Sequence, residues 1–285
     1  MAQGTKSISP PVRIGICAPS TPFTKDAASR VLALAARTHP KAELVFDEQC
    51  FFEDGHFAGS DKQRTDSFVA LANDPDIDAI WFARGGYGAA RIAEAAVQRL
   101  DSVASNKIYL GYSDAGNLLG VLYRDGIGEV AHGPMPSDIG RADGEQAVAR
   151  ALDWIVHRKA DALDPGLISG QKYAAFNLMT LAMMTGTKLI PDLRDHILIV
   201  EEISEYLYAF DRAMFHLCSN LADSGLTGIK LGRVDDIPEN DRPFGEDPEA
   251  IIKRWARSNA IAYLDRAEIG HDAQNRIVPF GLLKT

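Results

Sequence analysis

The sequence lacks paired cysteines, long apolar runs and an excess of basic residues, and each absence excludes a class of protein. It has three cysteines among 285 residues, at positions 17, 50 and 218. They are too few and too scattered for a disulfide framework or a CxxC zinc site, and they fit a reducing compartment. No apolar run approaches the roughly 20 residues that cross a bilayer. The opening residues 1–11 lack the hydrophobic segment of a secretory signal. We therefore expect a cytoplasmic protein with no membrane partner.

The charge balance argues against nucleic acid as a partner. The chain has 30 Lys+Arg against 39 Asp+Glu and a net charge of −9. Without a basic stripe, such a chain is a poor binder of phosphate backbones. Metal-binding signatures such as HExxH are also absent, so we expect no metal. With 46% hydrophobic and 24% charged residues, the chain has the composition of a globular protein that buries a sizeable core.

In the first half of the chain, short apolar runs alternate with helical patterns. This alternation is typical of right-handed βαβ units, in which helices cover both faces of a parallel sheet. In such sheets, the functional residues lie at the carboxyl ends of the strands. We expect strands at Val12–Cys17, Ala42–Phe46, Asp78–Ala83, Lys107–Gly111 and Glu129–His132. The expected helices are Lys25–Thr38, Asp61–Ala72, Gly88–Leu100, Ala115–Asp125 and Asp143–His157.

The pattern changes after residue 157, which predicts a second domain. Residues 158–172 carry turn residues without a clear period and are expected to form a linker. A helix near Asn177–Thr185, a buried strand at His196–Glu201 and a helix from Glu205 to about Leu221 follow, and a strand is expected at Arg276–Leu282. We therefore expect an α/β domain at residues 12–157 and a smaller domain at residues 173–285, either mixed α/β or barrel-like.

The segment KIYLGYSDAGNLLG, residues 107–120, is the most informative for chemistry. An apolar strand runs directly into Ser113 and then into an apolar helix, which is the strand–turn–helix context of a nucleophile elbow. The strict G-x-S-x-G pattern is broken, because Ala115 takes the place of its last glycine. The alternative is that Ser113 or Asp114 is merely a helix N-cap.

A second strand ends in the glycine-rich turn ARGGYGAAR, residues 83–91. This segment does not match the dinucleotide-binding pattern G-x-G-x-x-G/A, because Arg91 occupies the position of the third small residue. This argues against a dinucleotide-dependent oxidoreductase. Backbone N–H groups of such a turn, next to a serine elbow, are suited to form half of an oxyanion hole. The alternative is a tight turn without a ligand.

Serine chemistry also needs a base and a carboxylate that orients it. Among the seven histidines, His271 lies in an irregular loop, where catalytic residues concentrate. His132, at a strand end near the same sheet edge, is the second candidate. Glu201 and Glu202 end an apolar strand, and burial there would perturb a carboxyl pKa. Neighbouring strand residues point to opposite faces, so only one of the two glutamates faces a given site.

Taken together, these segments resemble the LD-carboxypeptidase family of serine peptidases, the S66 group. The resemblance runs nearly end to end and is carried by eight segments in order: Ile14–Pro22, Ala83–Arg91, Leu110–Leu119, His132–Met135, Asn177–Leu193, Ile197–Arg212, Gly228–Arg233 and Gly270–Gly281. It implies a flavodoxin-like N-terminal domain and a smaller, β-rich C-terminal domain. A homodimer is the family expectation.

The resemblance also implies a Ser-Glu-His triad, which falls here on Ser113, Glu201 and His271. We expect the backbone N–H groups of Gly86 and Asp114 to form the oxyanion hole, and we expect no cofactor. The implied reaction removes the C-terminal residue of a small peptide, and the main expected substrate is a murein tetrapeptide. The alternatives are a microcin-immunity-like peptidase that cleaves a peptide–nucleotide or aminoacyl–nucleotide amide, and a small-molecule binding module without activity.

Overall fold

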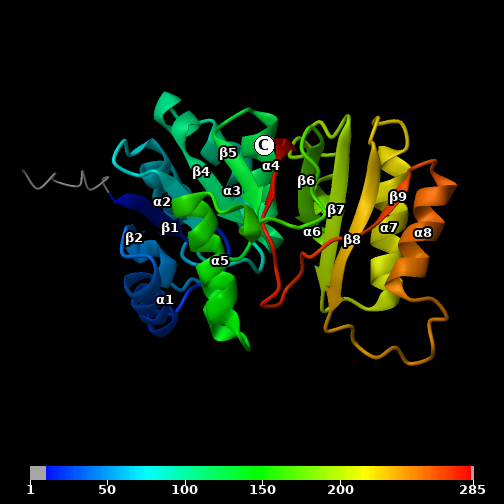
Figure 1. Ribbon diagram of the computed structural model, residues 1–285, viewed down its shortest axis with the longest axis horizontal. Helices are drawn as coiled ribbons and strands as arrows, with labels where there is room; N and C mark the ends of the chain where they lie inside the picture. The colour runs from blue at the N-terminus through cyan, green and yellow to red at the C-terminus, as the bar shows by residue number, and fades with distance from the viewer. Residues whose placement is uncertain (1–10, 284–285) are drawn as a thin grey trace, which may run out of the picture.

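Two open sheets stand side by side, and helices pack both between them and on their outer faces (Figure 1). The structure is a computed structural model and describes residues 11–283. Of the opening residues 1–11, only Pro11 lies within this range. Within it, no helix is long and apolar enough to span a membrane.

The first sheet is parallel except for one edge strand, and its strands are ordered β10-β5-β4-β3-β1-β2. The order 2-1-3-4-5 is that of flavodoxin-like sheets, whose ligands bind where the strand order reverses, beside β1 and β3. β10 joins β5 in antiparallel direction. The strands are β1 (Val12–Cys17), β2 (Ala42–Phe46), β3 (Ala79–Phe82), β4 (Ile108–Gly111), β5 (Glu129–His132) and β10 (Val278–Pro279).

Five helices cover the two faces of this sheet. Apolar side chains of α1 and α5 pack on one face, and those of α2, α3 and α4 pack on the other. The helices are α1 (Lys25–Thr38), α2 (Asp61–Asn73), α3 (Ala89–Val97), α4 (Gly116–Arg124) and α5 (Gly144–His157), and each begins and ends within three residues of its predicted position. Thr24 and Ser60 cap α1 and α2 through their hydroxyl oxygens. Short 3₁₀ turns lie at Glu48–Phe51, Ser102–Asn106, Ser113–Ala115, Pro136–Gly140 and Ala160–Ala162.

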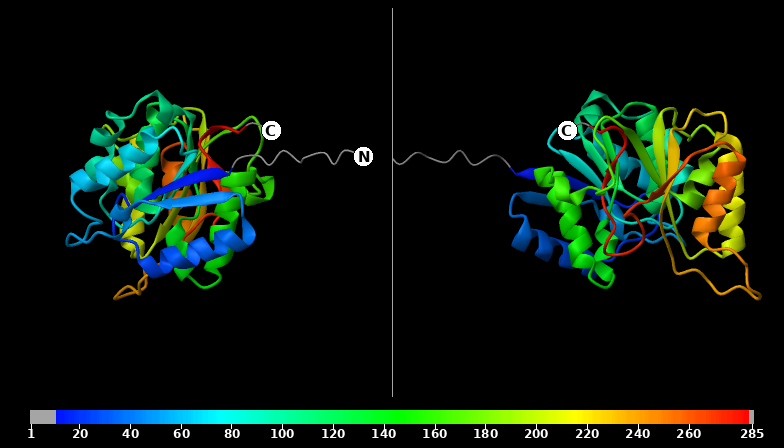
Figure 2. Two further views of the ribbon diagram at one scale, coloured as in Figure 1. Left: turned by 90° about the vertical axis from the view of Figure 1, so that its left-hand side faces the viewer. Right: turned by 45° about the vertical axis from the view of Figure 1, so that its right-hand side comes forward.

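The second sheet has the order β11-β6-β7-β8-β9 and is open, so the barrel-like alternative is wrong. α7 and α8 cover its outer face (Figure 2). α8 was not expected from the sequence. The elements are β6 (Lys172–Asn177), α6 (Leu178–Met184), β7 (His196–Ile203), α7 (Leu207–Leu221), β8 (Gly228–Asp235), α8 (Pro248–Ser258), β9 (Tyr263–Arg266) and β11 (Gly281–Leu282). The α/β class and the two-part layout are confirmed.

The C-terminal segment joins the two sheets. The single strand expected at residues 276–282 is in fact two short strands, because Val278 pairs with β5 and Gly281 pairs with β6. In Figure 1 this red segment runs between the two sheets. The connection at residues 158–172 is held against it, since Ile277 N–H donates to the carbonyl of Ala162 at 3.0 Å. The exact domain limits stay a prediction.

Candidate active site

The candidate site lies at the carboxyl ends of the strands of the first sheet, where the second sheet meets it. Loops after β3 and β4 bring Gly85, Gly86 and Ser113 to this edge. Glu201 lies near the end of β7, and His271 lies in the loop between β9 and β10. Residues from both sheets therefore meet in one cleft, at the place where flavodoxin-like sheets bind ligands.

Ser113 occupies a strained turn between β4 and α4. Its φ is 57°, in the left-handed region that non-glycine residues rarely adopt. Its side chain makes no helix-capping hydrogen bond: the N-cap residues of the 3₁₀ turn and of α4 are Tyr112 and Ala115, and neither uses its side chain. The capping explanation for Ser113 is therefore wrong, and the strained turn leaves the hydroxyl facing the cleft that Ser113 lines.

The carboxylate of Asp114 fixes the turn from behind. It accepts hydrogen bonds from Ser20 Oγ at 2.5 Å, from the Ala89 N–H at 2.8 Å and from Asn117 Nδ2 at 3.1 Å. Burial raises the pKa of Asp114, against the effect of these three donors. One buried carboxylate thus ties the loop after β1 and the start of α3 to the serine turn. From the sequence, the Asp114 side chain was expected at most to cap its own helix, and this link was not predicted.

The glycine pair after β3 lets the backbone approach the serine. A Cβ on Gly85 would lie 2.9 Å from Ser113 Cβ and 3.0 Å from its Oγ. Gly86 has φ 108°, and a Cβ there would meet the side chain of Thr21 at 2.5 Å. The N–H groups of Gly86 and Asp114 donate to no other group of residues 11–283. Two unused N–H donors beside a hydroxyl are what an oxyanion hole requires.

His271 and Glu201 form a buried pair. His271 Nδ1 lies 2.6 Å from Glu201 Oε2, and the two side chains are 6% and 0% exposed. The ring of Tyr112 packs on the imidazole with centroids 4.7 Å apart. Burial lowers the pKa of His271, but the charge and hydrogen bond of Glu201 outweigh it, so the pKa is raised above its usual 6.5. The carboxylate thereby favours the imidazolium form of the ring.

Glu202 points to the other face of β7, as strand alternation predicts. Its carboxylate accepts hydrogen bonds from Asn177 Nδ2 at 2.6 Å and from the Met179 N–H at 2.8 Å. Burial, and then the neighbouring charge of Glu201, raise the pKa of Glu202 to about 7. Neither glutamate is a solvated strand-end charge. Only Glu201 contacts a histidine.

His132, the second candidate for the base, does not contact either glutamate. Its ring is buried, and neither ring nitrogen has a hydrogen-bond partner within the described range. Burial, followed by the charges of His271 and Arg233, lowers the pKa of His132 to about 3. It is a neutral ring packed edge-on against Tyr112, with centroids 5.5 Å apart.

The cleft consists of two hollows on either side of Ser113. Ser113 and Gly86 line both of them. The first, of about 460 Å³, also contains His271, Arg84 and Arg141 and is called the arginine hollow below. The second, of about 370 Å³, contains acidic and amide side chains and is called the acidic hollow: Glu202, Glu205, Asn117 and Asn177. Neither arginine was predicted from the sequence to be a site residue.

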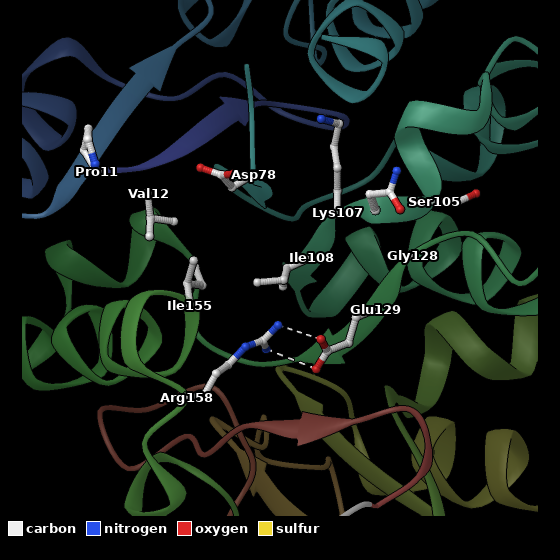
Figure 3. A pocket seen from close by; sticks show the side chains of 11 residues that line it. Pro11, Val12, Asp78, Ser105, Lys107, Ile108, Gly128, Glu129, Ile155 and Arg158 are labelled. Atoms are coloured by element: carbon white, nitrogen blue, oxygen red, sulfur yellow. Dashed lines mark hydrogen bonds and ion pairs between the residues drawn. The ribbon is translucent and has the colours of Figure 1, made fainter. Parts of the chain in front are cut away.

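A larger cavity, of about 560 Å³, lies at the opposite, amino ends of the strands of the first sheet (Figure 3). The ion pair of Arg158 with Glu129 stands at one side of it, at 2.6 Å. Ser105 also lines this cavity, but no histidine does. The amino ends of parallel strands are not where such sheets place their ligands, so size alone does not identify the site.

Comparison with known proteins agrees with a hydrolytic site built from a serine, a histidine and a glutamate on this α/β fold. Residues 14–133 match the LD-carboxypeptidase N-terminal domain, and residues 173–284 match the LD-carboxypeptidase C-terminal domain. The chain therefore belongs to the LD-carboxypeptidase family and is a serine-type peptidase. The resemblance inferred from the eight segments is confirmed.

Individual relatives support a peptidase. The murein tetrapeptide carboxypeptidase of Pseudomonas aeruginosa is 28% identical over 249 residues, which cover 79% of this chain and 78% of that protein. The probable murein peptide carboxypeptidase of Bacillus subtilis is 25% identical, over 94% of this chain and 86% of that protein.

Solved structures share the fold. The muramoyltetrapeptide carboxypeptidase from Oxalobacter formigenes has a TM-score of 0.76 at 24% identity, covering 94% of this chain and 93% of that chain. The microcin C7 self immunity protein MccF, solved with glutamyl sulfamoyl guanosine, has a TM-score of 0.78 at 21% identity, covering 96% and 92%.

Proposed function

We propose that this enzyme removes the C-terminal residue of a small peptide through an acyl-enzyme on Ser113. The observation that carries the proposal is the buried pair of His271 and Glu201, 2.6 Å apart, in the cleft that Ser113 lines. A serine on a strained turn, a histidine in the same hollow and a carboxylate on that histidine have the geometry of a catalytic triad.

The first half of the reaction forms the acyl-enzyme. Because His271 Nδ1 is held by Glu201, its Nε2 is the nitrogen that takes the proton from Ser113 Oγ. Oγ attacks the scissile carbonyl carbon, and the oxyanion forms beside the N–H groups of Gly86 and Asp114. When the intermediate collapses, the carbon–nitrogen bond breaks and His271 gives its proton to the leaving amine.

The second half of the reaction uses water. His271 takes a proton from a water molecule, which attacks the acyl carbon of the ester, and Ser113 Oγ leaves and recovers its proton from the imidazolium. Glu201 stabilises the imidazolium in both halves without itself taking the proton. No step requires a cofactor.

The names of the curated relatives favour a murein tetrapeptide, L-Ala-γ-D-Glu-diaminopimelate-D-Ala, as the substrate, with release of the terminal D-Ala during cell-wall recycling. The second candidate is the amide of an aminoacyl–nucleotide adduct. It is favoured by the structural likeness to MccF, which was solved with glutamyl sulfamoyl guanosine and with aspartyl sulfamoyl adenosine.

Mass spectrometry after incubation with each compound separates these possibilities. Murein tetrapeptide should lose its terminal D-Ala, and a Ser113→Ala preparation should leave it intact. Cleavage of aminoacyl-sulfamoyl adenosine alone would establish the second candidate. If both compounds remain intact with the wild type, both proposed substrates are wrong.

We further propose that the enzyme acts in the cytoplasm as a homodimer. The scarcity of cysteine supports the compartment, because thiols stay reduced there. The family resemblance supports the dimer. Sedimentation equilibrium should give twice the chain mass of 31.0 kDa, and a mass that stays at one chain would contradict the dimer.

A further inference from the structure

The two hollows of the cleft carry opposite charge. Two cations, Arg84 and Arg141, line the arginine hollow, and no aspartate or glutamate does. The acidic hollow is lined by Glu202 and Glu205 and by no lysine or arginine. Since Ser113 lies on both, a peptide bound across it meets a cationic wall on one side and an acidic wall on the other.

The general acid determines which side holds the leaving residue. In the proposed mechanism, His271 must come within about 2.6–3.2 Å of the leaving nitrogen. His271 lines the arginine hollow and not the acidic one. The residue that leaves therefore occupies the arginine hollow, and the acyl part of the peptide occupies the acidic hollow.

We propose that Arg84 and Arg141 form a subsite for the C-terminal carboxylate of the leaving residue. This inference rests on the proposed peptidase function and deepens it. The carboxylate is the one negative group that a leaving α-amino acid always carries. A guanidinium matches it, because its planar N–H donors bind both carboxylate oxygens.

Arg141 is held in a fixed orientation. Its Nε donates to Asp138 Oδ1 at 3.0 Å, and this buried carboxylate also accepts from Tyr112 Oη at 2.7 Å and from the Met135 N–H at 2.8 Å. The guanidinium also lies beside the Tyr112 hydroxyl, and within residues 11–283 its Nη groups form no ion pair with a carboxylate. An arginine that is anchored through Nε and has no carboxylate on its Nη groups is preorganised for an anion.

Arg84 provides a positive charge that no carboxylate of residues 11–283 neutralises, whereas the charge of Arg141 is partly neutralised by Asp138. Within the described range Arg84 pairs with no carboxylate, and its guanidinium makes one hydrogen bond, to the carbonyl of Pro22 at 3.3 Å. It directly precedes Gly85, whose backbone touches Ser113. The uncompensated cation therefore lines the same hollow as Ser113 and His271, on the leaving side.

This charge pattern explains why an enzyme of this geometry would release only a terminal residue. A peptide that continues beyond the leaving residue has a neutral amide where its carboxylate would lie, and both guanidinium groups would stay without their partner. In the acidic hollow a carboxylate would meet Glu202 and Glu205. The reversed orientation is therefore disfavoured as well.

The test compares two peptides that differ only at the C-terminus, the proposed substrate L-Ala-γ-D-Glu-diaminopimelate-D-Ala and the same peptide ending in D-alaninamide. The variants are Arg84→Gln and Arg141→Gln. The control is Arg37→Gln. Arg37 is an exposed arginine in the last turn of α1, and it pairs with Glu145. The wild type and the control should prefer the acid by more than about 100-fold in kcat/KM.

Each hollow variant should lose about 10- to 100-fold in kcat/KM for the acid, the range expected for one hydrogen bond to a charged group. The loss should appear mainly in KM, and cleavage of the amide should stay nearly unchanged. If kcat/KM falls equally for the acid and the amide, or falls for neither, the two arginines do not bind the carboxylate and the proposal is overturned.

A second readout needs no turnover. D-alanine at tens of millimolar should slow the reaction of Ser113 with a fluorophosphonate in the wild type and in Arg37→Gln, whereas D-alaninamide should not. Arg84→Gln should lose this protection. If neither peptide is cleaved, the proposed substrate is wrong, and the labelling experiment alone tests the subsite. Equal rates of Ser113 labelling with D-alanine and with D-alaninamide would then overturn the subsite proposal. If there is neither cleavage nor labelling, the proposed function falls and the subsite falls with it.

Discussion

At the scale of single residues, the two adjacent glutamates of β7 have different environments. Glu201 contacts one polar group, the imidazole of His271, while Glu202 is held by an amide and two backbone N–H groups. The difference arises from the alternation of a strand, which sends neighbours to opposite faces. In the proposed mechanism Glu201 orients the base on one face, while Glu202 fixes the start of α6 on the other.

Replacing each glutamate by glutamine should separate these roles. Glu201→Gln removes the charge that stabilises the imidazolium, so kcat should fall by about three to four orders of magnitude, as when a triad carboxylate is neutralised. Glu202→Gln keeps the shape and should lower kcat by less than about tenfold. Steady-state kinetics on one peptide measures both. Equal, mild losses would mean that neither carboxylate orients the base.

The pH profile should report His271. The imidazole must be neutral to accept the serine proton, so kcat/KM should rise with pH through the pKa of His271, which is raised above 6.5. Without the charge of Glu201, the effect of burial, which is the largest cause, is no longer outweighed and the pKa of His271 falls. The acid limb of residual activity in Glu201→Gln should therefore move to lower pH. A limb that stays in place would show that another group titrates.

Ser113 should matter for chemistry and not for stability. Its side chain caps no helix, so Ser113→Ala should change the melting temperature little, whereas loss of a cap costs about 0.5–2 kcal/mol. Turnover should fall by several orders of magnitude, to the level that binding and the oxyanion hole supply. Ser258→Ala, on the exposed face of α8, is the control. Near-normal activity in Ser113→Ala would disprove the covalent mechanism.

At the scale of elements, the site depends on how closely the turn after β3 approaches the turn after β4. Gly85 is at the contact, and its φ is not in the left-handed region, so space and not backbone conformation requires a glycine there. Asp114 holds the two turns together by capping α3 from the serine turn.

Adding one methyl group should show this dependence. In Gly85→Ala the new Cβ would lie 2.9 Å from Ser113 Cβ, so the serine must move and kcat should fall at least about 100-fold. Gly140→Ala adds the same methyl to the same hollow where nothing lies within 4 Å. It should keep most of the activity. If both variants lose activity equally, crowding of the hollow and not displacement of Ser113 is the cause.

The elements that the sequence predicts well are those whose signal is local. Apolar runs and capping residues such as Thr24 and Ser60 locate the strands and helices of the first sheet to within three residues. The missed features depend on distant partners. Val278 and Gly281 read as one strand because nothing nearby reveals that they pair with different sheets.

The same division holds in the candidate site. The strand–turn–helix pattern around Ser113 is local, and it was found. The pairing of Glu201 with His271 spans 70 positions and came from the family resemblance alone. The long-range bonds of Asp114 and the charged walls of the cleft have no sequence period, so only the structure reveals them.

At the scale of the whole molecule, the site belongs to neither sheet alone. Ser113 and the glycine turn come from the first sheet, and Glu201 and His271 come from the second half. Gly120 of α4 lies against Met184 of α6 so closely that a Cβ would be 2.4 Å from Met184 Cε. This packing and the shared C-terminal segment hold the two halves in register. The proposed activity of Ser113 therefore requires both halves of the molecule.

The most direct test of this account is the site and rate of reaction with a fluorophosphonate, measured by peptide mapping and mass spectrometry. The wild type should carry the adduct on Ser113, and His271→Ala should form it at least about 100-fold more slowly, because the hydroxyl then lacks its base. An adduct on another residue, or an equal rate in His271→Ala, would contradict a nucleophile on one sheet activated by a histidine from the other half.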